Sequence, residues 1–267
     1  MAQELYPQDP YLDGEVHFLE EPDSFVKRVL CYPRTSCADF DEKLDALLED
    51  GFTYLLEVGK DVLGIRVLGK GYSAIVVAAH HVARGIGALK VLRVDSRSNS
   101  LLREAEMARR ALPSGLPPRV YLGRHFYVFY ELLPPHICKP LTLVIEGLLT
   151  RGDVHTLTSL LRNALTSLYA LDLLRVDHTE INRPYGHVFY CNGVVKVIDW
   201  ESARVSSKPN NLTSFVSYLL FRSRHADKLR YTLGYSVGRV LSSLRAYKAA
   251  YSLEAFSEVL GSLIPAS

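Results

Sequence analysis

Four short β-rich runs between residues 52 and 94 constrain the possible folds more than any other feature of the sequence. They read TYLLEVG, LGIRVLG, SAIVVAAH and GALKVLRV, with glycines at or near their boundaries. Runs of this kind are typical of an antiparallel meander. A helical pattern follows in SLLREAEMARRAL and ends at the breaker PSGLPP, after which RVYLG and HFYVFYELL predict two further strands. We therefore predict an antiparallel sheet with one inserted helix.

The pattern becomes mostly helical after Pro134 and Pro135. Residues 154–174 place leucines on one broad helix face, and the polar loop RVDHTEINRPYGH follows. The next segment, VFYC-NG-VVKVID, is a predicted hairpin because Asn-Gly supplies the two positive-φ positions of a type I′ turn. Helices are expected again from about residue 211. The predicted fold class is α+β, with a β-rich N-terminal lobe that carries one helix and a reduced, mainly helical C-terminal lobe.

The first 50 residues are predicted to form an N-terminal extension. Residues 1–36 contain four prolines and little periodicity, which predicts an irregular arm. The segment DFDEKLDALLEDG predicts an amphipathic helix, capped by Asp39 and followed by Gly51, and we expect it to pack on the β-rich lobe. The predicted division of the chain is 1–50, 51–133 and 134–267.

Charge and hydropathy exclude several classes of partner. The net charge is +2, with 31 Lys and Arg against 29 Asp and Glu, so the whole chain has no general attraction to nucleic acid or anionic membranes. Nucleic acid is therefore expected only as part of a larger complex. No apolar run reaches the length of a membrane span, and the N-terminal segment does not resemble a secretory signal. We predict a cytoplasmic protein with no membrane partner.

The cysteines show no C-x-x-C spacing and no associated histidine cluster. We therefore expect free or buried thiols in a reducing compartment, and sequence leaves a Cys31–Cys37 bridge open. The other two are Cys138 and Cys191.

A glycine-rich stretch, LGKGYSAIVV, begins at residue 68. Its small residues follow the G-x-G-x-x-G order, with Lys70 between the glycines and Val76 two residues beyond the last small position; the small positions are Gly69, Gly71 and Ala74. Small residues allow backbone N–H groups to approach phosphate oxygens closely. A strand rather than a helix follows, which excludes a dinucleotide-binding βαβ motif. A plain hairpin turn is the alternative.

Lys90 lies 21 residues after Gly69, inside an apolar strand pattern. A lysine in that setting must face solvent or meet anions, and an ammonium group beneath a glycine flap is suited to nucleotide phosphates. Such a lysine needs a carboxylate to hold it. We favour Glu104 over Glu106, because Glu104 shares its helix face with the apolar residues that should pack on the sheet.

Two further acidic positions lie in the C-terminal half. Asp199 ends the apolar strand VVKVI, and an aspartate at the end of a buried strand commonly binds a cation, although it can also cap the following turn. Upstream, Asp177 and Asn182 have D-x-x-x-x-N spacing. This spacing fits a loop whose aspartate accepts a hydroxyl proton while its asparagine binds Mg²⁺.

In order and spacing, these segments resemble the protein-kinase-like fold, and most of all its small atypical members, the RIO group and its archaeal Ser/Thr kinase relatives. The resemblance runs from about residue 60 to 221. It implies that ATP is bound with Mg²⁺ or Mn²⁺, that Lys90 contacts phosphates while Glu104 pairs with it, and that Asp199 holds the metal. It also implies that adenine is bound by Ala88 and by the hinge backbone at Glu131, Leu132 and Leu133, with Tyr130 as gatekeeper.

Three departures from the kinase pattern leave alternatives open. RVD replaces H-R-D, and HTE at 178–180 makes Glu180 an alternative to Asp177 as the base. His187, rather than Asn182, immediately precedes a strand, so either could be the second metal ligand; imidazole suits Mn²⁺ better than Mg²⁺. DWE replaces DFG, as in many aminoglycoside and choline phosphotransferases, and no A-P-E follows, so activation gated by phosphorylation is not expected.

The function expected from this resemblance is ATP-dependent phosphoryl transfer to a Ser/Thr hydroxyl of a protein substrate or of the chain itself. A small-molecule phosphotransferase is the first alternative. The residues after DWESA show no acid-rich patch for a cationic acceptor, which favours a macromolecular substrate. A nucleotide-binding ATPase or pseudokinase scaffold is the second alternative, motivated by the unusual catalytic loop.

Overall fold

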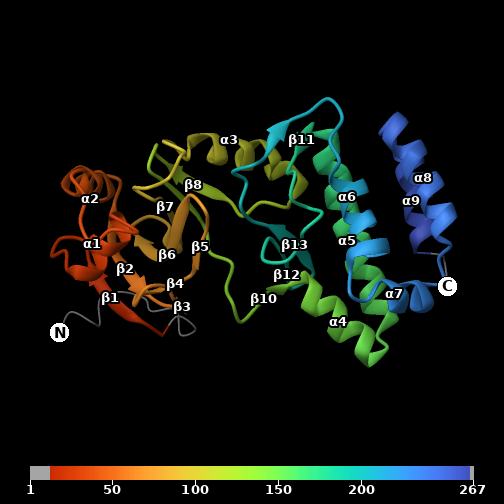
Figure 1. Cartoon of the computed structure of the whole chain (residues 1–267), viewed down its shortest axis with the longest axis horizontal. Helices are drawn as coiled ribbons and strands as arrows, with labels where there is room; N and C mark the ends of the chain where they lie inside the picture. Colours follow the sequence, from red (N-terminus) through yellow and green to blue (C-terminus); the bar gives the residue numbers. More distant parts are fainter. Residues whose placement is uncertain (1–12, 265–267) are drawn as a thin grey trace. The chain divides into compact units, whose positions relative to one another are not determined.

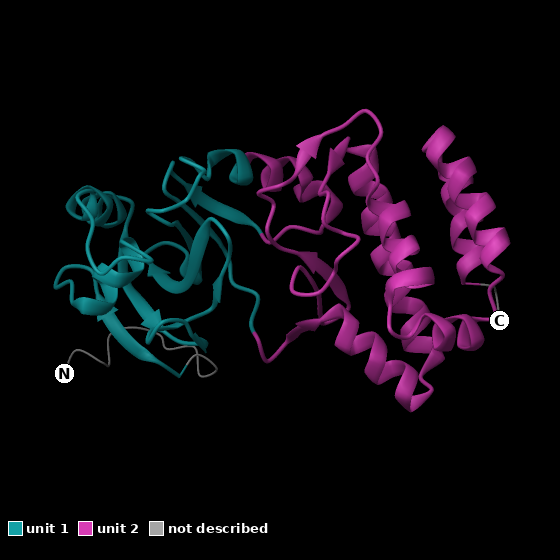
Figure 2. Cartoon of the chain, in the orientation of Figure 1, with its two compact units in different colours: residues 1–105, 119–134 teal, residues 106–118, 135–267 magenta. Residues whose placement is uncertain are grey.

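The computed structural model describes residues 13–264 (Figure 1) and divides the chain into two compact units (Figure 2). Unit 1 combines Met1–Ala105 with Arg119–Pro134, and unit 2 combines Glu106–Pro118 with Pro135–Ser267. This partition differs from the division drawn from sequence at residues 50 and 133. It groups the described residues before 50 with the sheet, and it assigns 106–118 to unit 2.

Unit 1 is built on an antiparallel sheet with the strand order β1-β2-β6-β7-β9-β8, in which β5 also pairs with β6. The α+β class and the antiparallel sheet are thereby confirmed. The strands are β1 Glu15–Phe18, β2 Phe52–Glu57, β5 Gly69–Lys70, β6 Ala74–His81, β7 Gly85–Leu92, β8 Val120–Gly123 and β9 Tyr127–Glu131. The run LGIRVLG was predicted to be a strand of the meander, but it does not form one: within residues 13–264, its strand β4 (Arg66–Val67) pairs with β3 (Lys60–Asp61) in a separate two-stranded ladder.

Residues 1–12 lie outside the described part of the chain, and the segment 13–36 is not the irregular arm that its prolines predicted. It contains β1, which pairs with β2, and helix α1 (Ser24–Leu30). Asp23 caps this helix by accepting hydrogen bonds from the backbone N–H groups of Phe25 and Val26. The apolar side chains of α1 share one buried core with the sheet.

Helix α2 (Phe40–Glu49) forms where the amphipathic pattern predicted it and adds Leu44 and Leu47 to the same core. Gly51, after its end, has a φ of 92°. Asp39 is the N-cap residue, as predicted, but its side chain makes no capping hydrogen bond, and its carboxylate instead pairs with Lys43 one turn later, at 2.9 Å.

Helix α3 (Leu102–Ala111) crosses the boundary between the units, which falls between Ala105 and Glu106. A short 3₁₀ helix (Leu112–Ser114) follows, and Gly115 ends it with a φ of 76°. The breaker PSGLPP therefore acts where it was predicted.

Unit 2 has a small three-stranded sheet in the order β10-β12-β13, comprising Cys138–Pro140, Val188–Cys191 and Val194–Val197. Asn192 and Gly193 both have positive φ, 44° and 95°, as the predicted type I′ turn requires. A second ladder joins β11 (Val176–Asp177) to β14 (Arg204–Val205). The helices are α4 Leu141–Arg151, α5 Val154–Leu173, α6 Asn211–Ser217, a π-helix Tyr218–Arg222, α7 Ala226–Leu233, α8 Val237–Ala250 and α9 Leu253–Leu263.

All four cysteines are in disulfides, so the expectation of free thiols is wrong. Cys31 pairs with Cys37, the alternative that sequence left open. Cys138 pairs with Cys191 although 53 residues separate them, because they are register partners across β10 and β12, with Cα atoms 4.2 Å apart. This partnership depends on strand register, which cysteine spacing does not reveal.

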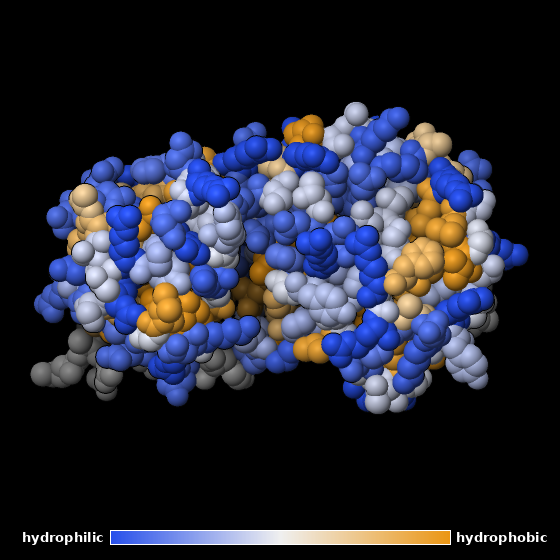
Figure 3. All heavy atoms as spheres, viewed as in Figure 1, coloured by the Kyte–Doolittle hydropathy of each residue, from blue (hydrophilic) through white to orange (hydrophobic). Residues whose placement is uncertain are grey.

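Hydrophilic side chains cover most of the face seen in Figure 3, with smaller apolar patches among them. Within residues 13–264, no helix combines the length and apolar character that crossing a bilayer requires.

Candidate functional site

Lys90 lies in the middle of the unit 1 sheet and forms a buried ion pair. On β7 it is the register partner of Val76 on β6 and of Val128 on β9. Its Nζ is 2.7 Å from Oε2 of Glu104 on α3, and the two side chains are 9% and 2% exposed. The carboxylate selected by the fold is thus Glu104, while Glu106 is exposed. Burying such a pair has a desolvation cost that can exceed its Coulombic gain, so stability alone is a weak reason for it.

Tyr130, on β9, adds a second contact to this carboxylate. Its hydroxyl donates a hydrogen bond to Oε1 of Glu104 at 2.9 Å, and it is also the register partner of Ala88 on β7. Glu131 ends β9, where its backbone N–H donates to Arg119 O at 2.8 Å and its Oε2 accepts from Arg119 N–H at 3.1 Å. Ala88, Glu131, Leu132 and Leu133 are half-buried, and all belong to unit 1.

The glycine-rich stretch forms a tight turn between β5 and β6. Gly69 is the register partner of Val76, and the N–H of Gly71 donates to Ala74 O at 2.8 Å. Neither glycine has a positive φ. A Cβ at Gly69 would meet nothing within 4 Å, and one at Gly71 would meet only Ala74 O at 3.5 Å. The local fold therefore does not require glycine at either position, while Lys70 between them is exposed.

In unit 2, Asp177 is buried at the end of β11. Its Oδ1 accepts from the N–H of Thr179 at 3.3 Å, and its Oδ2 lies 3.7 Å from Nη2 of Arg204. Arg204 is its register partner on β14. The β11–β14 ladder thus holds this carboxylate beside a guanidinium.

Glu180, His187 and Asp199 converge in the same unit. Glu180 Oε2 lies 3.5 Å from His187 Nε2, and Asp199 Oδ2 lies 4.0 Å from His187 Nδ1. Each residue offers one ligand atom, and these atoms lie within 4.8 Å of one another. Ser202 orients Glu180 by donating to its Oε1 at 3.0 Å. Sequence placed Glu180 as an alternative base, whereas its position also suits a metal ligand. Asn182 is half-buried in the same loop.

The backbone around this group adopts a conformation that L-residues seldom take. Arg175, Thr179 and Asp199 have φ values of 57°, 69° and 66°. A non-glycine residue in this region costs on the order of 1 kcal/mol or more, and such residues cluster at functional sites. No glycine marks these positions in the sequence.

His178 was not assigned a role of its own from sequence, yet it connects the two acidic segments. Its ring is fully buried, its Nε2–H donates to Ile198 O at 3.2 Å, and it meets Trp200 edge to face at 4.7 Å between ring centroids. Burial lowers the pKa of His178 to about 4, so the ring is neutral near pH 7. The hydrogen bond from His178 therefore holds the backbone of Ile198, the residue that precedes Asp199.

A buried polar network anchors the start of the loop to the helices. Asp172, on α5, accepts from Asn211 Nδ2 at 2.8 Å and from the Tyr247 hydroxyl at 2.8 Å. Asn211 Nδ2 also donates to Val176 O at 2.6 Å, and Asn211 Oδ1 accepts from the N–H of His178 at 2.9 Å. Burial raises the pKa of Asp172 despite these donors. Sequence patterns identified none of these residues.

No protein-family model matches the chain, and no curated protein matches it. The resemblance to atypical kinases therefore stays a prediction from the sequence.

Proposed function

We propose that this chain is an ATP-dependent phosphotransferase of the protein-kinase-like type, with a Ser/Thr hydroxyl of a protein or of the chain itself as acceptor. The observation that carries the proposal is the buried Lys90–Glu104 ion pair within the antiparallel sheet. A fixed ammonium on β7, two strands from a turn whose glycines are not needed for folding, is suited to the phosphates of ATP.

In the proposed reaction, Lys90 compensates phosphate charge, and Asp177 orients the acceptor hydroxyl and takes its proton. Asp199 would hold the divalent ion, with His187, Glu180 or Asn182 as further ligands. One imidazole nitrogen with two carboxylates suits Mn²⁺ better than Mg²⁺. The bound ion would supply charge compensation for the transferring group, so catalysis is mainly positioning and electrostatic stabilisation.

The direct test is incubation of the purified chain with γ-labelled ATP and either Mg²⁺ or Mn²⁺, with and without a general protein acceptor. Label on the chain or on the acceptor is the expected result, stronger with Mn²⁺. Phosphate release without labelled protein would contradict the proposal and identify an ATPase. Nucleotide binding without turnover would contradict it in favour of a scaffold.

The glycine turn gives a second prediction. Gly69→Ala and Gly71→Ala should leave the melting temperature nearly unchanged, because neither added Cβ meets an obstacle, but should weaken ATP binding by about tenfold by keeping phosphate away from the backbone. Titration with a fluorescent ATP analogue and a thermal melt measure the two effects. Gly87→Ala is the control for packing, since its Cβ would lie 2.4 Å from the Phe129 ring and should lower the melting temperature. Unchanged affinity in both turn variants would contradict the assignment.

A small-molecule acceptor is the second candidate, favoured by a pocket of about 250 Å³ within unit 2. Tyr185 and Gly186 line it, directly before His187 in the chain. Glu146 is the carboxylate in its lining, and it lies 3.5 Å from His225. The pocket thus does not favour a cationic acceptor. ADP formation that depends on a neutral alcohol, with no labelled protein, would support this candidate.

A further inference from the structure

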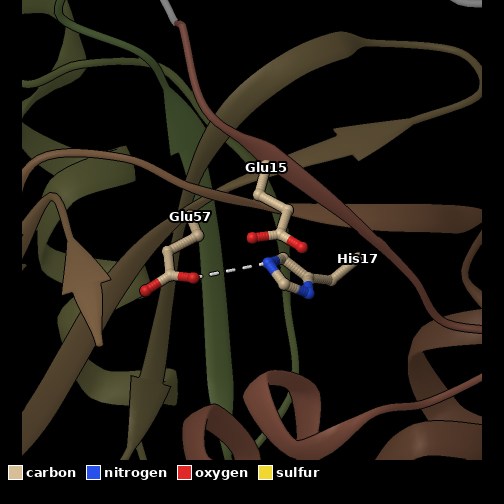
Figure 4. A group of neighbouring side chains, drawn as sticks. All are labelled: Glu15, His17 and Glu57. Carbon is tan, nitrogen blue, oxygen red and sulfur yellow. Dashed lines mark ion pairs between the residues drawn. The ribbon is translucent and has the colours of Figure 1, made fainter. Parts of the chain in front are cut away.

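A second group of potential metal ligands lies in unit 1, on the two strands β1 and β2. Glu15 on β1 is the register partner of Glu57 on β2, and His17 lies two residues along β1 from Glu15. Alternate residues of a strand share one face, so all three side chains project from the same side of the sheet. Figure 4 shows both carboxylates turned toward the imidazole ring of His17.

His17 presents an unused nitrogen to these carboxylates. Its side chain is 6% exposed, and its ring stacks on Phe25 with centroids 4.2 Å apart. Nε2 has no hydrogen-bond partner among the described residues and lies 3.6 Å from Glu57 Oε2. One atom from each of the three residues lies within 4.8 Å of the others. This buried nitrogen faces two carboxylates but makes no hydrogen bond. A bound ion is one of the few explanations for such a group in a folded protein.

Further hydrogen bonds hold two of these residues, His17 and Glu57, in a binding orientation. His17 Nδ1 lies 2.6 Å from Asp23 Oδ2, and Asp23 is fixed in turn by its backbone hydrogen bonds at the start of α1. A carboxylate there places the ring proton on Nδ1 and leaves Nε2 as an electron-pair donor.

Glu57 is oriented in the same way. Its Oε1 accepts a hydrogen bond from the backbone N–H of Arg66 at 2.8 Å, while its Oε2 faces His17. Two carboxylates directly opposite each other on an antiparallel pair repel. A divalent cation bound between Glu15 and Glu57 would remove that repulsion, and it would accept the electron pair of His17 Nε2.

We propose that Glu15, His17 and Glu57 bind a divalent transition-metal ion, Zn²⁺ before others, which clasps the edge strand β1 to β2. Ligand atoms of a tetrahedral zinc site are about 3.4 Å apart when each bond is about 2.0–2.1 Å. The separation of 3.6 Å between Nε2 and Oε2 is close to that value. Glu15 is exposed and can adjust by rotation. Mg²⁺ prefers oxygen ligands only and should not compete. The site is independent of the proposed phosphotransferase activity.

The test uses the untagged full chain carrying Asp199→Asn and His187→Gln, which removes two donors from the group formed by Glu180, His187 and Asp199. Zinc binding is measured by competition with a chromophoric chelator, and Co²⁺ is added as a spectroscopic probe. We expect one Zn²⁺ per chain, a Co²⁺ absorption typical of four-coordinate N/O ligation, and a higher melting temperature with Zn²⁺. Glu57→Gln and His17→Gln should each weaken Zn²⁺ binding at least about 100-fold, and Glu15→Gln at least about tenfold.

Glu20→Gln is the matched control, because Glu20 is exposed two residues after β1 and its replacement changes the charge equally. Because Glu15 is exposed, Glu15→Gln should stay folded, which separates ligand loss from unfolding. Zinc affinity in Glu15→Gln and Glu57→Gln equal to that of the Glu20→Gln control would overturn the proposal. Absence of Zn²⁺ binding, with an imidazolium signal for His17 in NMR spectra near pH 7, would also overturn it and identify a charged histidine clamp.

Discussion

Asp199→Asn is expected to lower phosphoryl transfer from ATP by at least about 10²–10³-fold without unfolding the chain. The change removes the negative charge that would hold the divalent ion in the proposed site, and it keeps the size of the side chain. Asparagine also tolerates the left-handed backbone at this position, where φ is 66°. The carboxylate is one third exposed, so its loss leaves no buried unpaired group. Initial rates of label transfer and a thermal melt measure the two effects.

Asp227→Asn is the matched control for Asp199→Asn, since Asp227 is exposed in the first turn of α7.

Lys90 requires a paired change, because removing one partner of a buried ion pair costs about 3–5 kcal/mol. Lys90→Met combined with Glu104→Gln keeps the site neutral and should fold, yet lose transfer to a similar extent. The exposed Lys60→Met supplies its control. If either site variant transfers label as fast as its control, the proposed function is wrong.

Replacing Cys138 and Cys191 together by serine should lower the free energy of unfolding by about 4 kcal/mol. A cross-link over 53 residues removes more conformational freedom from the unfolded chain than a short one does. The same relation gives about 2 kcal/mol for Cys31 and Cys37, which are six residues apart. Urea unfolding without reductant compares the two double variants under identical conditions.

Thiol titration of the unfolded chain without reductant should detect no free thiol, since both pairs are oxidised. Adding reductant should shift the unfolding midpoint of the parent chain toward that of the variants. Equal stability of the Cys138/Cys191 variant and the parent would show that this pair does not constrain the unfolded state.

Locally encoded features could be predicted from the sequence. The Asn192-Gly193 turn, the leucine-rich helix α5 and the main strands of the sheet follow from turn chemistry and periodicity over a few residues. Pairing that joins distant segments could not be predicted in the same way. Strand β1 is four residues long, and its partner β2 begins more than 30 residues later.

The same distinction applies to the candidate site. Lys90 and Glu104 were identifiable because a strand and the helix that follows it pack together, and the helix face selects one glutamate. The convergence of Glu180 with His187 and Asp199 depends on left-handed backbone at Thr179 and Asp199, which no glycine announces. His178 and Asp172 act through burial and hydrogen bonds formed only in the folded chain, so no motif contains them.

The boundary inside α3 means that neither unit is a contiguous piece of chain. Residues 106–118 come between the two parts of unit 1 in the sequence, but their hydrogen-bond partners belong to unit 2. Leu116 O accepts from the N–H of Val197, and Pro117 O accepts from Lys196 Nζ. A fragment that stops at Pro134 would keep those carbonyls and lose their donors. Limited proteolysis should therefore release no stable half of the molecule. During synthesis, the ribosome must add Lys196 and Val197, which come long after the last strand of the unit 1 sheet, before residues 106–118 can form these hydrogen bonds.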